Sequence, residues 1–188
     1  MVDNPGPLLF VHAHPDDKTL ATGGTIARYS RAGHDVAIVT CTAGEQGTVP
    51  DGEFDQLMND RDGTLAAARA AEAEAACVLL DAGHRWLGGL FTYRDSGRLG
   101  SHANAHPRAF WAADIDEAAV ALADTIVAVR PHAIVTYDPH LPVHGQQARP
   151  PGAEGRSSDL LEGIQGITST CSNRQPVPSA PVHPRRSS

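Results

Sequence analysis

The chain has 188 residues, 41% of them hydrophobic and 5% aromatic, which suits a single soluble α/β domain. Its formal net charge of −7 argues against nucleic acid or an anionic membrane as the main partner, and no apolar run reaches the roughly 20 residues of a membrane span. We expect no signal peptide, since no basic segment followed by an apolar stretch opens the sequence. Three widely spaced cysteines, Cys41, Cys77 and Cys171, favour reduced thiols and a cytoplasmic location over a disulfide framework.

Strand-like and helix-like segments alternate along the first 138 residues. Short apolar or β-branched runs predict strands, and longer periodic runs predict helices. The expected strands are 8–13, 36–42, 85–87 and 133–137, and the expected helices are 18–32, 62–80 and 114–129. This order predicts an α/β fold, a Rossmann-like parallel sheet with helices on both faces.

Two of the expected helices carry signals for their ends or their buried side. Asp16 or Asp17 is placed to cap the first helix and Gly33 to end it, although the pair 23–24 of glycines weakens its interior. The last helix has apolar side chains available to face a core, and Pro131 stops it. These side chains are Ile115, Val120, Leu122 and Ile126.

The character of the sequence changes after residue 138. Residues 139–188 hold eight of the 14 prolines and five arginines against three acidic residues, and only 159–167 has the pattern of a short helix. A segment with so little apolar content is expected to be a disordered tail. We therefore predict two parts, a domain over 1–138 and a tail over 139–188. The step suggests a truncation or a change of reading frame, which translation of the other two frames would test.

Polar side chains gather where each expected strand ends. They are, in chain order, His12, His14, Asp16 and Asp17; Thr40, Thr42 and Glu45; Arg94 and Asp95; and Thr136, Tyr137 and Asp138, followed by His140 and His144. The carboxyl ends of parallel strands meet at one edge of a sheet, where open α/β folds bind their ligands. We therefore expect the four loops to converge on one site.

The stretch H-P-D-D at 14–17 has the chemistry of a metal site with its own base. Imidazole nitrogen and carboxylate oxygen suit zinc, and a catalytic zinc keeps one position open for water. If His14 and Asp17 bind the metal, Asp16 lies beside the bound water and is placed to take its proton. The alternative is a proline turn in which Asp16 or Asp17 is an ordinary helix cap.

Five motifs resemble the LmbE-like (PIG-L) N-deacetylase family, in that family's order. They are "LLFVHAHPDD", "VTCTAGEQG", "RAAEAEAA", "YRDSG" and "RPHAIVTYDP", which together extend from about Leu8 to Asp138. Within the family, the chain is most similar to the branch that deacetylates N-acetylglucosaminyl-inositol in mycothiol biosynthesis, and next to the mycothiol conjugate amidases. The resemblance implies zinc-dependent hydrolysis of an acetamide on an amino sugar, with a small-molecule substrate.

The resemblance also implies residue roles. His14 and Asp17 match two of three zinc ligands, and Asp16 matches the general base. Arg69 and Asp95 match residues that contact the sugar-inositol substrate. Glu45 matches an acid that lines the same site, and Tyr137 matches a tyrosine that precedes the family's catalytic tyrosine.

Several of these residues have simpler interpretations. His12 lies inside the strand end and is expected to be packed rather than a metal ligand. Arg69 and Glu72 form either part of a substrate site or a solvated i,i+3 pair, and Glu45 either lines the site or is exposed in its glycine-flanked loop.

The sequence departs from the family at two places. Lys18 stands where the family has glutamate; it either points inward and weakens metal binding, loses its charge on burial, or turns outward. The family's H-P-D-H segment, which carries the third ligand, is absent after "TYDP". His144 is the candidate replacement, although Pro142 argues against a helix that would align it with His140.

Two hypotheses follow. The first is a zinc-dependent N-deacetylase, and the second is a non-catalytic, truncated relative with an incomplete metal site. A dinucleotide-binding protein ranks third because no G-x-G-x-x-G follows the first strand. If the tail leaves apolar surface uncovered, self-association is expected.

Overall fold

A parallel four-stranded sheet forms the centre of the molecule. The computed structural model describes residues 6–47, 63–97 and 100–137. The strands are β1 (Leu8–His12), β2 (Val36–Thr40), β3 (Gly83–Trp86) and β4 (Ala133–Val135), in the order β3-β2-β1-β4. The predicted α/β class and parallel sheet are confirmed, and each strand lies within two residues of its expected bounds.

The register places the carboxyl ends of the strands side by side. Leu8 of β1 pairs with Val36 of β2 and with Ala133 of β4, and all the pairings are parallel. Since β1 lies between β2 and β4, the loop that follows β1 is flanked by the loops that follow its two neighbours. This arrangement brings the H-P-D-D turn to the middle of the sheet edge.

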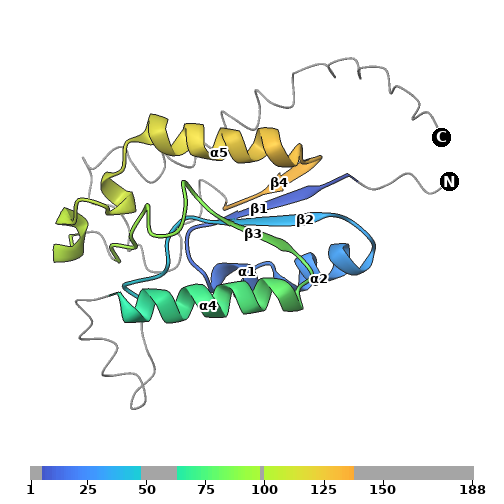
Figure 1. The fold of residues 1–188 in the computed structure, drawn as a ribbon, viewed down its shortest axis with the longest axis horizontal. Helices are drawn as coiled ribbons and strands as arrows, with labels where there is room; N and C mark the ends of the chain where they lie inside the picture. Colours follow the sequence, from blue (N-terminus) through green and yellow to red (C-terminus); the bar gives the residue numbers. More distant parts are fainter. Residues whose placement is uncertain (1–5, 48–62, 98–99, 138–188) are drawn as a thin grey trace, which may run out of the picture.

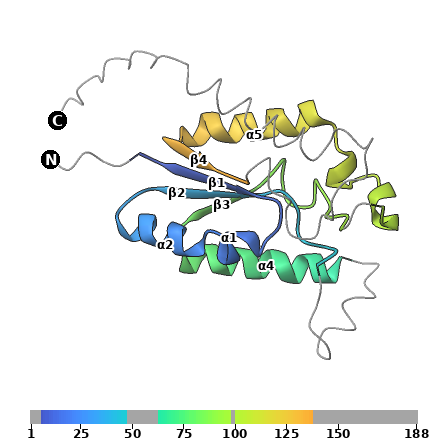
Figure 2. The ribbon, with the colours of Figure 1, turned by 180° about the vertical axis from the view of Figure 1, so that it is seen from behind.

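Helices cover both faces of the sheet. The helix α5 (Ile115–Val129) lies on one face, and α1 (Asp17–Leu20), α2 (Gly23–Arg31) and α4 (Thr64–Leu79) lie on the other (Figures 1 and 2). Two 3-10 turns, η1 (His102–Ala105) and η2 (Phe110–Ala112), precede α5. No helix of the described residues is long and apolar enough to cross a membrane.

The core divides into two clusters because alternate strand residues point to opposite faces. Leu9 and Val11 of β1 pack with Leu122 and Ile126 of α5. Phe10, between them in sequence, packs in a second cluster that includes Ile26, Ile38 and Cys77. The near-continuous apolar sequence of β1 is thus explained by burial on both sides.

The predicted helix 18–32 is wrong as a single element. The chain leaves α1 at Ala21 and starts α2 after Thr22, whose hydroxyl donates a hydrogen bond to the Lys18 carbonyl. Asp16 occupies the cap position of α1 with helical φ and ψ and makes no side-chain capping bond there, so the capping interpretation of Asp16 is also wrong. Gly33, with φ of +89°, follows the last turn of α2 as predicted.

The helix α5 begins at a capping aspartate and corrects the expected core face. The Asp114 carboxylate accepts hydrogen bonds from the backbone N–H groups of Asp116 and Glu117. Leu122 and Ile126 are buried, but Val120 is 61% exposed because the small Ala118 faces the core in its place. The predicted tail and the short helix at 159–167 lie outside the described residues.

Replacement of Leu122 by alanine tests the packing of α5. We expect a loss of about 2–5 kcal/mol in the free energy of unfolding, measured by urea denaturation, because the side chain is 1% exposed. Val120→Ala on the same helix is the control and should change stability by less than about 0.5 kcal/mol. Equal losses for the two variants would contradict the assignment of the core face.

Candidate active site

The turn after β1 brings His14 and Asp17 together. Backbone hydrogen bonds from Cys41 and Thr42 to the carbonyls of His12 and Ala13 carry the pairing past the end of β1, and Asp17 then opens α1. The His14 Nδ1 atom lies 3.3 Å from Asp17 Oδ2, and the His14 backbone N–H donates to the same oxygen at 3.0 Å. The i,i+3 spacing of H-P-D-D therefore brings an imidazole and a carboxylate into contact.

The hydroxyl of Tyr137 joins the end of β4 to this turn. It accepts a hydrogen bond from the Ala13 backbone N–H at 2.8 Å and donates one to Asp17 Oδ2. Asp17 Oδ2 thus has a donor from each of two chain segments that are more than 100 residues apart in the sequence. Tyr137 was expected at this edge because it follows the fourth strand, but no local sequence signal indicated its contact with Asp17.

Asp95 lies on the other side of the His14 ring. Its Oδ1 atom is 3.6 Å from His14 Nε2, whereas Asp17 faces Nδ1. Backbone N–H groups of Gln46 and Gly97 donate to the Asp95 carboxylate, and the Asp95 N–H donates to Glu45 Oε2 at 2.8 Å. The interpretation of Glu45 as a solvent-exposed loop residue is therefore wrong.

Arg69 extends from α4 to the loop after β2. Its Nη1 atom donates to the Gly44 carbonyl at 3.0 Å. Gly44 has φ of +70°, and a Cβ at Gly47 would collide with the Arg69 guanidinium. The glycines of "AGEQG" thus let the loop approach this side chain closely, next to the segment that holds Asp95.

Lys18 is buried, so the interpretation in which it turns outward is wrong. Its side chain is 1% exposed, and its Nζ donates a hydrogen bond to the Pro15 carbonyl. Burial lowers the pKa of Lys18, against the opposing influence of nearby groups on Cys77, Asp16 and Glu74. The buried amine of Lys18 thus binds the backbone of the H-P-D-D turn on the side that faces the core. Asp16, at the outer side of the turn, is exposed.

The two histidines at the end of β1 have opposite electrostatics. Burial lowers the pKa of His12 to about 4, against the attraction of Asp17. Burial would also lower the pKa of His14, but hydrogen bonds and charges of Asp17 and Asp95 outweigh it and raise that pKa to about 10. Burial likewise opposes ionisation of Asp17 and Asp95, yet hydrogen bonds led by His14 hold the pKa of each carboxyl below its usual range.

His12 is a packed residue, as expected. It is 2% exposed, and its Nε2 atom lies 2.9 Å from the Thr22 hydroxyl. Its ring and that of Tyr137 form a T-shaped pair with centroids 5.8 Å apart. Its Nδ1 atom is buried and has no hydrogen-bond partner in the described part of the chain. His84, which carried no predicted role, joins β3 to Thr40 and Glu74 by hydrogen bonds of 2.9 and 2.8 Å.

The His14–Asp17 pair fits two corners of a zinc site. Donor atoms about 2.1 Å from a tetrahedral zinc lie about 3.4 Å apart, close to the 3.3 Å between His14 Nδ1 and Asp17 Oδ2. A metal bound through this oxygen would replace one of its two hydrogen-bond donors. Asp95 cannot bind the same ion at that position because it faces the opposite ring nitrogen. Within 6–47, 63–97 and 100–137 no three His, Cys, Asp or Glu side chains are arranged to hold a metal, and His144 lies outside these ranges.

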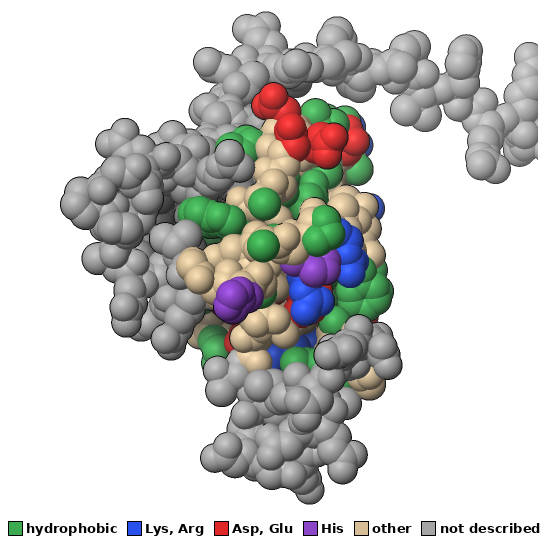
Figure 3. Space-filling model, turned by 90° about the vertical axis from the view of Figure 1, so that its left-hand side faces the viewer, with side chains coloured by type: hydrophobic (Ala, Val, Ile, Leu, Met, Phe, Trp, Pro, Cys, Tyr) green, Lys and Arg blue, Asp and Glu red, His purple; other side chains and the backbone are tan. Residues whose placement is uncertain are grey.

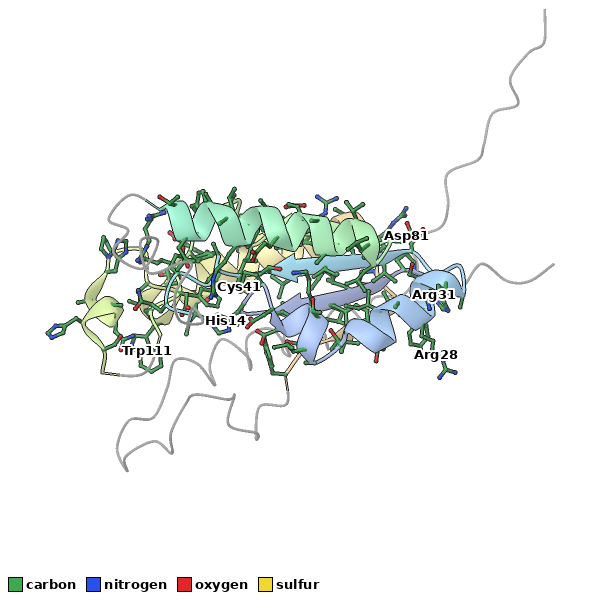
Figure 4. The ribbon with its side chains drawn as sticks, turned by 90° about the horizontal axis from the view of Figure 1, so that it is seen from below. His14, Arg28, Arg31, Cys41, Asp81 and Trp111 are labelled. Carbon is green, nitrogen blue, oxygen red and sulfur yellow. The ribbon has the colours of Figure 1, made fainter. Side chains whose placement is uncertain are left out.

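These residues gather at the end of the molecule where the strands terminate. His14 lies toward the end that carries Trp111, whereas Arg28, Arg31 and Asp81 lie at the opposite end (Figure 4). The view onto the first end shows histidine side chains close to a group of Lys and Arg side chains (Figure 3). Both histidine and basic side chains therefore face the surface at this end of the molecule.

The parallel sheet and the polar residues at its carboxyl edge, built on H-P-D-D, place the chain among the α/β proteins that bind ligands at this edge. The sequence profile of the PIG-L family, described as GlcNAc-PI de-N-acetylase, matches residues 9–147. The chain belongs to this family, which confirms the resemblance.

Curated relatives of the chain share half of its residues in the matched region. The 1D-myo-inositol 2-acetamido-2-deoxy-alpha-D-glucopyranoside deacetylase of Nocardiopsis dassonvillei is 50% identical over 133 residues, or 70% of this chain and 47% of the relative. The protein of the same name from Thermobifida fusca is 52% identical over 132 residues, 70% of this chain and 46% of the relative. The chain spans about half the length of these relatives.

Solved structures share the fold at lower identity. The N,N'-diacetylchitobiose deacetylase of Pyrococcus horikoshii has a TM-score of 0.56 at 24% identity, covering 90% of this chain and 52% of that one. GalB, the 4-carboxy-2-hydroxymuconate hydratase of Pseudomonas putida KT2440, has a TM-score of 0.53 at 22% identity, covering 88% and 55%. A deacetylase and a hydratase thus share this architecture, so the fold alone does not define the reaction.

Proton titration tests the electrostatics of the two histidines. In metal-free protein, NMR should show a His14 ring that stays protonated to about pH 10 and a His12 ring that stays neutral to about pH 4. Because the pKa of His14 is raised above its usual 6.5, its contribution to stability is present below pH 6.5 and lost as the pH rises to about 10. Asp95→Asn should lower the pKa of His14, and a wild-type midpoint near 6.5 would contradict the arrangement.

Proposed function

We propose that the chain is a zinc-dependent N-deacetylase that removes the acetyl group from an N-acetylglucosaminyl-inositol type of substrate. The single observation that carries the proposal is the His14–Asp17 pair, at zinc-ligand separation, with the exposed Asp16 next to it. The names of the curated relatives support the substrate class. The reaction is the hydrolysis of one amide bond, with acetate and a free amine as products.

His14 and Asp17 would hold the metal, and His144 is the proposed third ligand. Bound zinc would polarise the acetyl carbonyl and lower the pKa of a water molecule. For His14 to bind through Nδ1, that nitrogen must give up its proton, and the Asp95 carboxylate at the opposite ring nitrogen then favours a proton on Nε2. Asp95 would thereby fix the tautomer of His14, in addition to its proposed contact with the substrate.

Asp16 is the proposed general base. It lies between the two metal-binding residues in the sequence, and it is exposed, so water and substrate can reach it. Its carboxylate would accept a proton from the attacking water and return it to the leaving nitrogen. The buried Lys18 fixes the turn beneath Asp16 through its hydrogen bond to the Pro15 carbonyl.

Glu45, Arg69 and Asp95 are the proposed substrate-binding residues. Glu45 lies in the loop after β2 and accepts a hydrogen bond from the Asp95 backbone N–H. Arg69 extends from α4 and contacts the same loop at the Gly44 carbonyl. Carboxylates accept hydrogen bonds from sugar hydroxyls and guanidinium groups donate them. A polyhydroxylated substrate therefore suits this loop.

A non-catalytic relative is the second candidate. It is favoured by the sequence after "TYDP", which lacks the H-P-D-H segment that carries the third ligand in the family. An amidase of mycothiol conjugates is a variant of the first proposal with a larger acyl group.

We further propose that the protein is cytoplasmic and self-associates through exposed apolar side chains such as Val78, Leu79 and Val127. A monodisperse monomer in light scattering would contradict the association.

Calorimetric titration with zinc and a deacetylation assay test the proposal together. We expect one saturable zinc site that Asp17→Ala abolishes, and release of acetate from N-acetylglucosaminyl-inositol. Asp16→Asn should lower kcat by about 10²–10⁴-fold with zinc affinity nearly unchanged, because Asp16 is proposed to move protons rather than bind the metal.

Asp124→Asn, an exposed carboxyl on α5, is the matched control and should leave both zinc affinity and kcat unchanged. No saturable zinc binding by the wild-type chain would favour the non-catalytic candidate. A loss of zinc binding in Asp16→Asn equal to that in Asp17→Ala would reject the assigned division of roles.

A further inference from the structure

We infer that Tyr137 is a positioning residue that holds the Asp17 carboxylate in the orientation needed for metal binding. The evidence is the two hydrogen bonds of Tyr137, and the role in metal binding rests on the proposed function. The phenol hydroxyl contacts the backbone of the H-P-D-D turn on one side and the proposed ligand on the other.

The direction of both hydrogen bonds is fixed by chemistry. The Ala13 backbone N–H can only donate, so the Tyr137 oxygen accepts from it at 2.8 Å. The one hydroxyl proton is then directed to Asp17 Oδ2, which as a carboxylate can only accept. Tyr137 thus links the Ala13 backbone to the Asp17 side chain through its hydroxyl group.

The same carboxylate oxygen also accepts the His14 backbone N–H at 3.0 Å. Two donors from different segments therefore hold Oδ2 and restrict rotation of the carboxyl group about its bond to Cβ. Loss of the hydroxyl would leave this oxygen in contact with His14 alone, through its backbone N–H and its ring, and would remove the restraint from the second chain segment.

The position of Tyr137 follows from the pairing of β4 with β1. Phe10 pairs with Val135, and the Thr136 hydroxyl donates to the Val11 carbonyl at 3.2 Å. The next residue, Tyr137, therefore lies beside the end of β1. There the ring of His12, 5.8 Å away at an interplanar angle of 75°, limits its movement.

Two other roles for Tyr137 make different predictions. A purely structural tie would hold Ala13 without any effect on Asp17. A catalytic tyrosine would change turnover and leave the orientation of Asp17 unaltered. The His14 backbone N–H distinguishes these roles, because it is bonded to Asp17 and is not bonded to Tyr137.

The test is amide hydrogen exchange of metal-free protein, with and without Tyr137→Phe. We expect the amides of both Ala13 and His14 to exchange about fivefold faster or more relative to Val39 of the buried strand β2, since each would lose or weaken one hydrogen bond. Tyr29→Phe is the matched control and should change neither amide, because Tyr29 lies on α2 between Arg28 and Arg31, which are at the end of the molecule away from His14 (Figure 4).

Zinc affinity by chelator competition gives a second readout. Tyr137→Phe should weaken zinc binding about tenfold or more, as is typical for residues that orient metal ligands. Tyr29→Phe, the control used for hydrogen exchange, should leave zinc affinity unchanged.

Faster exchange of Ala13 with unchanged exchange of His14 would overturn the inference and leave a structural tie. Unchanged zinc affinity in Tyr137→Phe would overturn it as well. If the wild-type chain hydrolyses no substrate, the proposed function fails, whereas the exchange measurement still decides the role of Tyr137 because it uses neither metal nor substrate.

Discussion

The central position of β1 in the parallel sheet is the constraint on which the site depends. Its pairing with β2 and β4 is parallel and in register from Leu8 onward, so the segments after all three strands leave the sheet at one edge. A shift of one residue in β4 would turn Tyr137 to the opposite face and remove its contact with Asp17. The hydrophobic pattern of the strands therefore specifies the polar geometry of the site as well as the core.

Charge balance explains why the site tolerates burial. His14 lies between two carboxylates, Asp17 and Asp95, so each charged group has a partner of opposite sign. The neighbouring His12 is kept neutral by burial, which avoids a second positive charge beside the proposed metal position. Lys18 brings a cation close to the same turn, but its amine points to the Pro15 carbonyl on the core side, where carboxylates such as Glu74 oppose the cost of burial.

Local patterns predicted the strands, the α/β class and the contact between His14 and Asp17, since each depends on residues close in sequence. The break between α1 and α2 was not predicted because it depends on Thr22, which bonds back to Lys18 and packs against His12. Val120 was misplaced because the buried side of α5 runs through Ala118, Leu122 and Ile126, and apolar character alone does not select an alanine over a valine for that side. The contacts of Tyr137 with Asp17 and of Asp95 with His14 depend on tertiary structure, for which the sequence has no local signal.

Preorganisation links these observations to the proposed chemistry. Two freely rotating side chains bind an ion more weakly, because binding removes their conformational entropy. Most catalytic zinc sites also have a third protein ligand. Here the main chain and Tyr137 fix Asp17, while Asp95 and Asp17 fix the two nitrogens of His14. Because two ligands are already ordered, a third ligand such as His144 would lose only the conformational entropy of its own side chain on binding the metal. In the proposed metal site, a third protein donor would therefore complete a set of which two members are already ordered.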